Sequence, residues 1–288
     1  MDTKELLKKI RHLEIKTKGL TKHIFSGEYH SAFKGRGMTF SEVRDYHFGD
    51  EVRTIDWNVT ARFNEPYVKV FDEERELTVM LIIDVSGSEH FGTEGKTKKD
   101  LALEIAAILS FSAISNNDKV GAIFVSDKVE RYIAPGKGKK HSLVILRELI
   151  ELKPKSKGTD ISEALKFFRN TQKKRSIAFV ISDFIDEHDF MEGIKVSRKK
   201  HDMVAIRLHD GAEEELPNLG IIQLYNSETG ETTWVNSKSA HAKTIHKENF
   251  KAYEEKLFKE FHRAGIDYAS ISTNEDFILP LVKLFKNR

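Results

Sequence analysis

Short apolar strands alternate with amphipathic helices through most of this chain. Between the strands, apolar residues recur at helical spacing, as at Leu101, Ile105 and Leu109. Such alternation predicts βαβ units with right-handed crossovers, and therefore an α/β fold built on a mostly parallel sheet. The predicted strands are apolar runs bounded by polar residues, namely Leu77 to Ile83, Val120 to Val125, Ser176 to Ile181 and Met203 to Leu208.

Three further segments extend this pattern. Val129 to Ile133 closely follows the second strand and is ended by Pro135, which predicts an antiparallel edge strand. Two short runs on either side of Asn226 to Gly230 predict a β-hairpin insertion at about residues 217–237. A long amphipathic helix around Phe250 to Phe261 then leads to a strand near Tyr268 to Ile271.

The composition changes at about residue 77, which predicts two parts. Residues 1–76 begin with an amphipathic helix near Leu6 and continue as a segment rich in glycine, arginine and aromatic residues. We interpret that segment as an irregular, β-rich appendage. Residues 77–288 form the α/β domain with its hairpin insertion.

Composition excludes several classes of function. The formal net charge of +2 gives little reason to expect a nucleic-acid partner, and the absence of cysteine excludes disulfides, thiolate metal sites and cysteine nucleophiles. No run of about eighteen apolar residues exists, so we expect no membrane span. The amino terminus lacks the apolar core of a signal peptide, and we expect a cytoplasmic protein.

Oxygen-bearing side chains follow two of the predicted strands. Asp84-Val85-Ser86-Gly87-Ser88 comes directly after the first strand, and Asp183 follows the third. If these strands are neighbours whose helices leave to opposite faces, both groups meet at the topological switch point, where ligands bind in such sheets. Thr159, which opens a helix nearby, can complete a ring of oxygen donors for a hard cation such as Mg²⁺.

Structural roles are open for the same residues. Asp-x-Ser-x-Ser occurs as a turn in which Asp and Ser bond backbone amides, and Thr159 with Asp160 has the composition of a helix start. Asp183 is equally suited to capping the segment after it. A metal site is favoured over these local roles because three separate segments, those of Asp84, Thr159 and Asp183, occur in the expected order and are predicted to lie at one edge of the sheet.

The ordered set Asp84, Ser86, Ser88, Thr159 and Asp183 resembles the metal-ion-dependent adhesion site (MIDAS) of von Willebrand factor A domains. That resemblance spans about residues 77 to 208. It implies a von Willebrand A-like (Rossmann-like), doubly wound sheet that binds Mg²⁺ or Mn²⁺ through these five residues. Because the Ser and Thr hydroxyls are neutral, the ion would stay electrophilic, and we expect an acidic side chain of another molecule to displace a water at its open position.

A second resemblance lies in the appendage and concerns the bacterial domain-of-unknown-function 58 family. Members join such a segment to a von Willebrand A-like domain and are typically encoded beside MoxR-type AAA+ ATPases. This implies an accessory role in ATPase-linked assembly or maturation of client proteins. The matching residues are Gly35-Arg36-Gly37, Phe40, Glu42, Arg44, Tyr46, Gly49-Asp50, Arg53, Ile55-Asp56-Trp57 and Ala61-Arg62.

The arginines of this segment also have a local explanation. They alternate with acidic residues, which predicts an ion-pair network within the appendage, and Trp57 is expected to be a packing anchor or cation–π partner. Gly35-Arg36-Gly37 lacks the Walker spacing, so nucleotide binding is not expected. The arginines are Arg36, Arg44, Arg53 and Arg62, and the acids are Glu42, Asp45, Asp50 and Asp56.

We therefore expect a non-catalytic, metal-dependent protein-interaction module. The alternative is a metal-assisted phosphohydrolase, for which the sequence offers only Lys96 and Lys98 near the ligand loop along the chain. A third possibility is that the chain fills the site itself, for example with Glu42 or Asp50 of the appendage.

Overall fold

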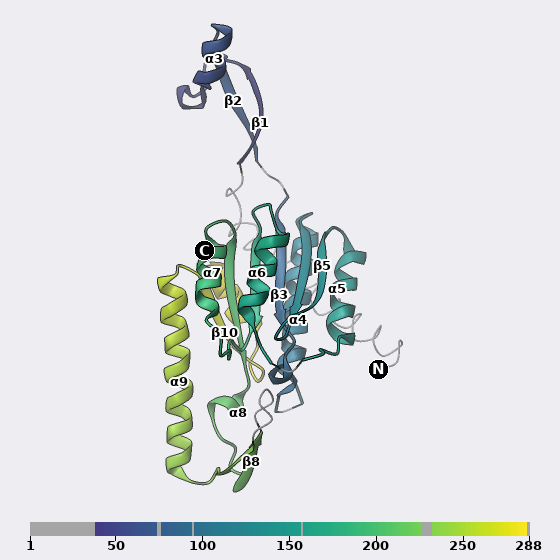
Figure 1. Ribbon diagram of the computed structural model, residues 1–288, viewed down its shortest axis with the longest axis vertical. Coiled ribbons are helices and arrows are strands. Elements are labelled where there is room, and N and C mark those ends of the chain that lie inside the picture. Colours follow the sequence, from purple (N-terminus) through teal and green to yellow (C-terminus); the bar gives the residue numbers. More distant parts are fainter. Residues whose placement is uncertain (1–37, 74–75, 94, 157, 226–231, 287–288) are drawn as a thin grey trace.

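The computed structural model describes residues 38–73, 76–93, 95–156, 158–225 and 232–286. The predicted helix near Leu6 and the Gly35-Arg36-Gly37 segment lie outside these residues. Among the described residues, the largest assembly is a six-stranded sheet with helices on both faces (Figure 1). The predicted α/β fold class is therefore correct.

The sheet has the strand order β10-β7-β6-β3-β4-β5. Neighbouring strands are parallel except for β5, which pairs antiparallel with β4 as predicted for the edge strand. The strands are β3 (Thr78–Asp84), β4 (Lys119–Val125), β5 (Val129–Gly136), β6 (Ile177–Ser182), β7 (Asp202–His209) and β10 (Asp267–Ser272). The predicted strand positions differ from these by a few residues at most.

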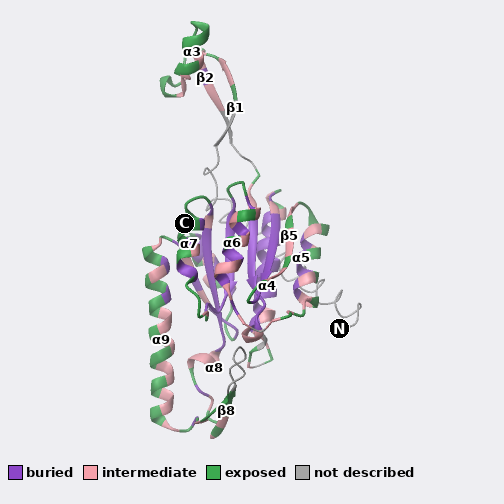
Figure 2. Ribbon diagram, in the orientation of Figure 1, coloured by how far each residue is buried: buried purple, intermediate pink, exposed green. Residues whose placement is uncertain are grey.

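Two layers of helices bury both faces of the sheet, which is why its central strands are apolar without alternation. On β3, Val79, Leu81 and Ile83 pack on one face and Met80 and Ile82 on the other. Figure 2 shows the central strands as the buried part of the molecule. The first face is covered by α4 (Lys98–Ser115), α5 (Lys139–Glu151) and α10 (Ile278–Lys286), and the second by α6 (Ile161–Thr171), α7 (Phe190–Arg198) and α9 (Ala240–Arg263).

The strands β3 and β6 are parallel neighbours, and their following helices leave to opposite faces. Helix α4 after β3 packs in one core, whereas α7 after β6 packs in the other. The expected switch point is therefore present at the carboxyl ends of these strands. Two short helices lie at this edge, η3 (Gly87–His90) and α8 (Gly211–Glu214).

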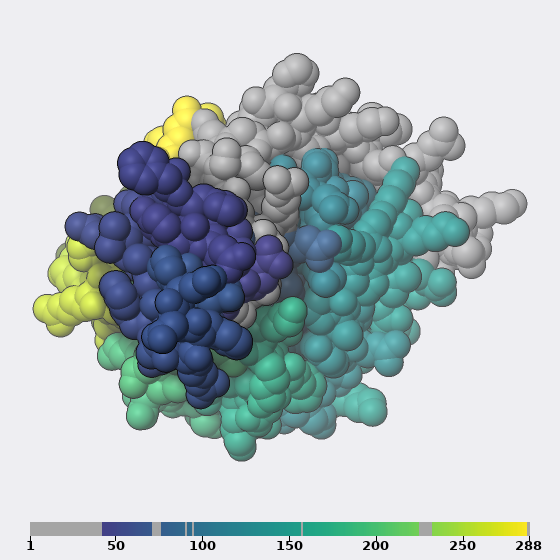
Figure 3. All heavy atoms as spheres, turned by 90° about the horizontal axis from the view of Figure 1, so that it is seen from above, coloured from purple at the N-terminus to yellow at the C-terminus, as the bar shows by residue number. Residues whose placement is uncertain are grey.

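Residues 38–73 form an arm that projects from the opposite end of the sheet (Figure 1). Its strands β1 (Met38–Asp45) and β2 (Tyr67–Glu73) are antiparallel, and η2 (Val52–Thr54) and α3 (Trp57–Phe63) lie between them. Figure 3 looks down on that end and shows the arm, in purple and blue, standing in front of the domain. The arm is thus remote from the carboxyl ends of β3 and β6.

Side chains of the arm are largely exposed. Trp57 is 66% exposed, so the expectation that it anchors packing is wrong, because α3 lies at the free end of the arm with little to pack against. The expected ion pairing is present at Arg44, whose guanidinium donates to both carboxylate oxygens of Asp50 at 2.8 Å. Asp56 instead caps α3 and pairs with Lys69 at 3.4 Å.

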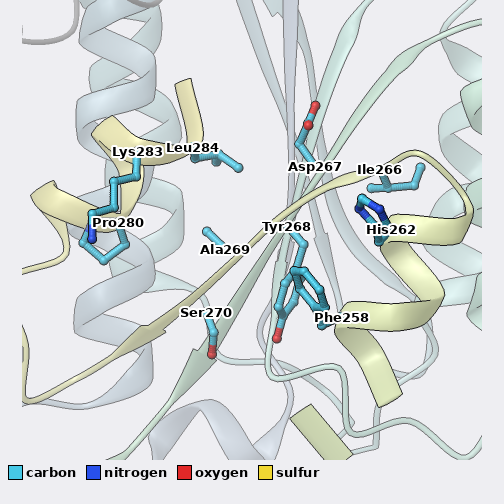
Figure 4. A pocket seen from close by; sticks show the side chains of 10 residues that line it. All are labelled: Phe258, His262, Ile266, Asp267, Tyr268, Ala269, Ser270, Pro280, Lys283 and Leu284. Atoms are coloured by element: carbon cyan, nitrogen blue, oxygen red, sulfur yellow. The ribbon is translucent and has the colours of Figure 1, made fainter. Parts of the chain in front are cut away.

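The other end of the domain carries the hairpin β8 (Ile221–Tyr225) and β9 (Thr232–Asn236), followed by α9. Along the free edge of β10 a groove of about 450 Å³ runs between α9 and α10. Figure 4 shows Phe258 and His262 on one side of this groove and Pro280 and Lys283 on the other. Among the described residues, no helix combines the length and apolar character that a membrane crossing requires.

Candidate metal centre

Asp84 is the last residue of β3 and is 3% exposed. Its Oδ1 accepts a hydrogen bond from the backbone N–H of Ser86 at 2.8 Å, and its Oδ2 accepts one from the hydroxyl of Ser182 on β6 at 2.7 Å. The hydroxyls of Ser86 and Ser88 lie 3.1 Å apart. The loop therefore turns at Ser86, which bonds Asp84 through its backbone N–H and contacts Ser88 through its hydroxyl.

Asp183 directly follows β6 and is fully buried. Its Oδ1 accepts from the backbone N–H of Ile185 at 3.0 Å. The next residue, Phe184, has a left-handed backbone with φ of 59°, which is uncommon for an aromatic residue and is maintained here by the surrounding packing. The Phe184 ring packs on Phe261, and the Tyr253 hydroxyl donates to its carbonyl, so α9 fixes the loop that carries Asp183.

Thr159 is 4% exposed on the loop before α6. The backbone N–H of Asp160 donates to the carbonyl of Ser126 after β4, and the N–H of Ile161 donates to Asp186 after β6, both at 2.8 Å. Thr159 therefore lies at the same edge of the sheet as Asp84 and Asp183. The Asp160 side chain accepts from Glu163 N–H, so the helix starts where it was expected, but Asp160 caps it and not Thr159.

Carboxylate oxygens of Asp84 and Asp183 lie within 4.8 Å of each other and of a third acid, Glu89. Glu89 is 1% exposed, and neither of its carboxylate oxygens has a hydrogen-bond partner among the described residues. The sequence analysis did not identify Glu89. In the sequence, Glu89 is recognisable only as an acidic residue immediately after Ser88, and such a residue is equally typical of a solvated loop.

A lysine lies inside this cluster. Lys98 is fully buried at the start of α4, and its Nζ lies 2.6 Å from Asp183 Oδ2 and 2.9 Å from Glu213 Oε1. The expectation that Lys98 is near the site only along the chain is wrong. The capped start of α4, with Thr97 and Asp100 in a capping box, directs it back to the strand ends. One ammonium group is thus placed among four carboxylates, those of Asp84, Glu89, Asp183 and Glu213.

The pKa values reflect this crowding of charge. Burial and the neighbouring Asp183 charge raise the pKa of Asp84 to about 7, and burial with the Asp84 charge raises that of Glu89 well above its usual value. Burial alone would lower the pKa of Lys98, but the charges of Asp183, Glu89 and Glu213 raise it. The cluster therefore favours additional positive charge.

The residues present fit a hard divalent cation. Their donors are carboxylate and hydroxyl oxygens, which Mg²⁺ and Mn²⁺ prefer, and the carboxylates outnumber the single ammonium group. The unpaired carboxylate of Glu89 is an additional ligand candidate beside the five predicted ones. A second acidic group, Asp160 with Asp186 and His188, is largely explained by backbone capping contacts.

Comparison with known proteins gives relatives without an assigned activity. An uncharacterized protein of Mycobacterium bovis is 27% identical over 296 residues, which cover 100% of this chain and 91% of the relative. Among solved structures, the conserved hypothetical protein BatB from Bacteroides thetaiotaomicron is similar at 14% identity and a TM-score of 0.48, covering 73% of this chain and 98% of BatB. The SpRpn10 VWA domain is similar at 11% identity and a TM-score of 0.42, covering 74% of this chain and 95% of that domain.

The family comparison covers most of the chain. The model described as "Protein of unknown function DUF58" matches residues 42–256, which include the β2 strand of the arm, the metal-centre candidates and most of α9. The match confirms the family expected from the sequence, although it begins after Gly35-Arg36-Gly37 and Phe40 and extends past the hairpin into α9. The chain belongs to the DUF58 family.

Proposed function

We propose that this protein is a non-catalytic, metal-dependent protein-interaction module. Asp84, Ser86, Ser88, Thr159 and Asp183 would hold Mg²⁺ or Mn²⁺, which when bound would offer a coordination position to a carboxylate. The observation that supports this most directly is the convergence of three buried carboxylates within 4.8 Å, one of them without a hydrogen-bond partner among the described residues. Buried acids left in that state are costly unless a cation is bound.

Glu89 gives the proposal a specific form. Because its carboxylate already lies beside Asp84 and Asp183, Glu89 is suited to fill the cation's remaining position. Glu42 and Asp50, the acids suggested for this role from the sequence, belong to the arm at the far end of the sheet. An acidic residue of a client protein would then replace Glu89 at the ion. Ser88, the half-buried member of the ligand set, marks the side from which it would approach.

The partner in this proposal is a MoxR-type AAA+ ATPase, on the strength of the family resemblance, with the protein acting in the cytoplasm in assembly or maturation of clients. The arm is the second surface suited to a partner. It exposes four large apolar side chains, those of Phe48, Val52, Trp57 and Phe63, each more than 60% exposed.

A phosphohydrolase needs a free cation or base beside the metal, and here Lys98 is engaged by two carboxylates at 2.6 and 2.9 Å. The proposal therefore assigns Lys98 a structural role, in which it reduces repulsion between Asp183 and Glu213. Steady turnover of a phosphate ester that Asp84→Asn abolishes would overturn this assignment in favour of the enzyme.

Metal binding is tested with Mn²⁺, whose free form is followed by electron paramagnetic resonance. We expect wild-type protein to bind Mn²⁺ and Mg²⁺ to compete, whereas Asp84→Ala and Asp183→Ala bind at least about tenfold more weakly, since each removes a charged ligand. Glu192→Ala, which removes an exposed acid of α7, is the matched control and should bind like the wild type. Equal binding by all four proteins would refute the metal site.

The partner is tested separately with the purified MoxR-type ATPase immobilised on a biosensor. We expect binding in Mg²⁺ that a chelator and Asp84→Ala both reduce. Binding that is indifferent to the chelator, in a protein that does bind Mn²⁺, would show that the ion is a structural component and would refute its role in partner recognition.

A further inference from the structure

A second charged side chain with unused hydrogen-bond donors is buried beneath α9. Arg207, on β7, is 2% exposed, and its Nε and one terminal nitrogen have no hydrogen-bond partner among the described residues. Its side chain lies on the face of the sheet that α9 covers. There the guanidinium lies 4.8 Å from the ring centre of Phe250 and 5.4 Å from that of Tyr253.

These rings do not replace hydrogen-bond partners. Stacking on an aromatic face uses the flat surface of a guanidinium and leaves the N–H groups at its edge free. The nearest acid is Glu254, whose Oε1 is 3.6 Å from the unpartnered terminal nitrogen, beyond hydrogen-bonding distance. A buried cation in this state is expensive unless another group completes its shell.

A cavity opens in front of this arginine. It has a volume of about 350 Å³, and its lining includes Arg207, the rings of Phe250 and Tyr253, Ile185, His246 and the acid Glu213. His246 Nε2 is also buried without a partner. Its volume lies within the usual range for ligand pockets, about 300–1,000 Å³. The pocket therefore combines apolar walls with two unused polar groups.

We propose that this pocket binds a carboxylate attached to an apolar group. A carboxylate matches the free edge of a guanidinium in shape and charge, and its apolar body would lie against Phe250, Tyr253 and Ile185. Glu213 and Glu254 near the cavity disfavour the greater negative charge of a phosphate. The pocket adjoins the metal centre, because its lining residue Glu213 also pairs with Lys98, which in turn pairs with Asp183.

The carboxylate has two possible sources, a free small molecule or the carboxyl end of a polypeptide. The probes are therefore 4-phenylbutyrate with its amide, and the peptide acetyl-Gly-Gly-Phe with a free or amidated carboxyl end. Binding is measured by isothermal titration calorimetry in a chelator, so that the result does not depend on the metal centre. We expect each acid to bind at least about tenfold more tightly than its amide, since a charge-assisted pair is lost.

Tighter binding of 4-phenylbutyrate would identify a free small molecule as the source of the carboxylate, and tighter binding of acetyl-Gly-Gly-Phe would identify the carboxyl end of a polypeptide. Two results would overturn the proposal. One is that neither acid binds detectably at millimolar concentration, and the other is that the amides bind as tightly as the acids.

Two substitutions with opposite expected signs test the residues. Arg207→Gln should weaken binding of the acids at least about tenfold, whereas Glu254→Gln should strengthen it several-fold, because the competing negative charge is removed. Arg131→Gln, at an exposed arginine of β5, is the control and should have no effect. If Arg207→Gln fails to fold, Glu254→Gln still decides, because general damage to the fold would not strengthen binding. Unchanged or weaker binding by Glu254→Gln would refute the assignment.

Discussion

Replacing Asp84 with asparagine should stabilise the metal-free protein at neutral pH and abolish its response to Mg²⁺. Asp84 is buried beside Asp183, and this raises its pKa from 3.8 to about 7. A carboxyl group with a raised pKa stabilises the fold when protonated, and that stability is lost as pH rises through the folded pKa. Asparagine retains the shape and an oxygen to accept the Ser86 N–H, and it carries no charge at any pH.

The magnitude follows from the pKa difference. At about 1.4 kcal/mol per pKa unit, the difference between the folded pKa of Asp84 and its ordinary value lowers the free energy of unfolding by about 4 kcal/mol near pH 7.5. Near pH 5 the loss is about 2 kcal/mol, because there the carboxyl group ionises only in the unfolded chain. The difference between Asp84→Asn and wild type should therefore shrink by about 2 kcal/mol between those pH values. Other titrating groups are common to both proteins and cancel in the difference.

The assay is urea unfolding in a chelator, followed by circular dichroism. Fluorescence is unsuitable because Trp57 and Trp234 lie in the arm and the hairpin, outside the main sheet. In Mg²⁺ at pH 7.5 the wild type should regain stability, whereas Asp84→Asn should not respond. A stability difference that does not change with pH, or a variant that is less stable than wild type at pH 7.5 without metal, would refute the reasoning.

Three further outcomes are expected. Glu89→Gln should raise metal-free stability near pH 7.5 and weaken Mn²⁺ binding in the resonance assay, because it removes a buried carboxylate without a partner. Burial lowers the pKa of His201 to about 4, so the neutral ring stabilises the fold above pH 6.5, and this stabilisation is lost as the pH falls towards 4. In the Asp84→Asn background, His201→Gln should therefore reduce the decrease in the free energy of unfolding over that pH range, measured by urea unfolding. Gly121→Ala should cost about 1–3 kcal/mol in the same assay, because its Cβ would lie 2.8 Å from Met80 Sδ and 2.9 Å from the Ile133 carbonyl oxygen.

The sheet could be predicted well from the sequence because strands that are buried on both faces are apolar at every position. Every residue from Val79 to Ile83 is apolar, since alternate side chains enter two separate cores. The position of Asp84 and Asp183 follows equally directly, since the carboxyl ends of parallel neighbours share one edge. These features depend on local pattern and on a general rule of topology.

Other parts of the candidate site depend on contacts that no local pattern contains. Lys98 reads as an ordinary polar residue at the start of a helix, and only the turn of residues 85–97 brings it to Asp183, 85 positions along the chain. Glu89 reads as a solvated loop residue. Trp57 was expected to pack because of its type, and the arm provides no core to receive it. In each case the burial of the side chain was decided by tertiary structure.

The two unusual charges at this end of the domain have opposite signs and are not paired with each other. Arg207 is in register with Ser182, whose hydroxyl bonds Asp84, so β7 could present a cation to the acidic cluster from that face of the sheet. Its guanidinium instead lies over the Phe250 and Tyr253 rings of α9, 3.6 Å from Glu254, while both carboxylate oxygens of Glu89 lack a hydrogen-bond partner among the described residues. Folding stability alone favours pairing or removing such groups, because each is costly when buried by itself. We infer that they are kept apart because each serves a counter-charge from outside the chain, a cation at Glu89 and a carboxylate at Arg207.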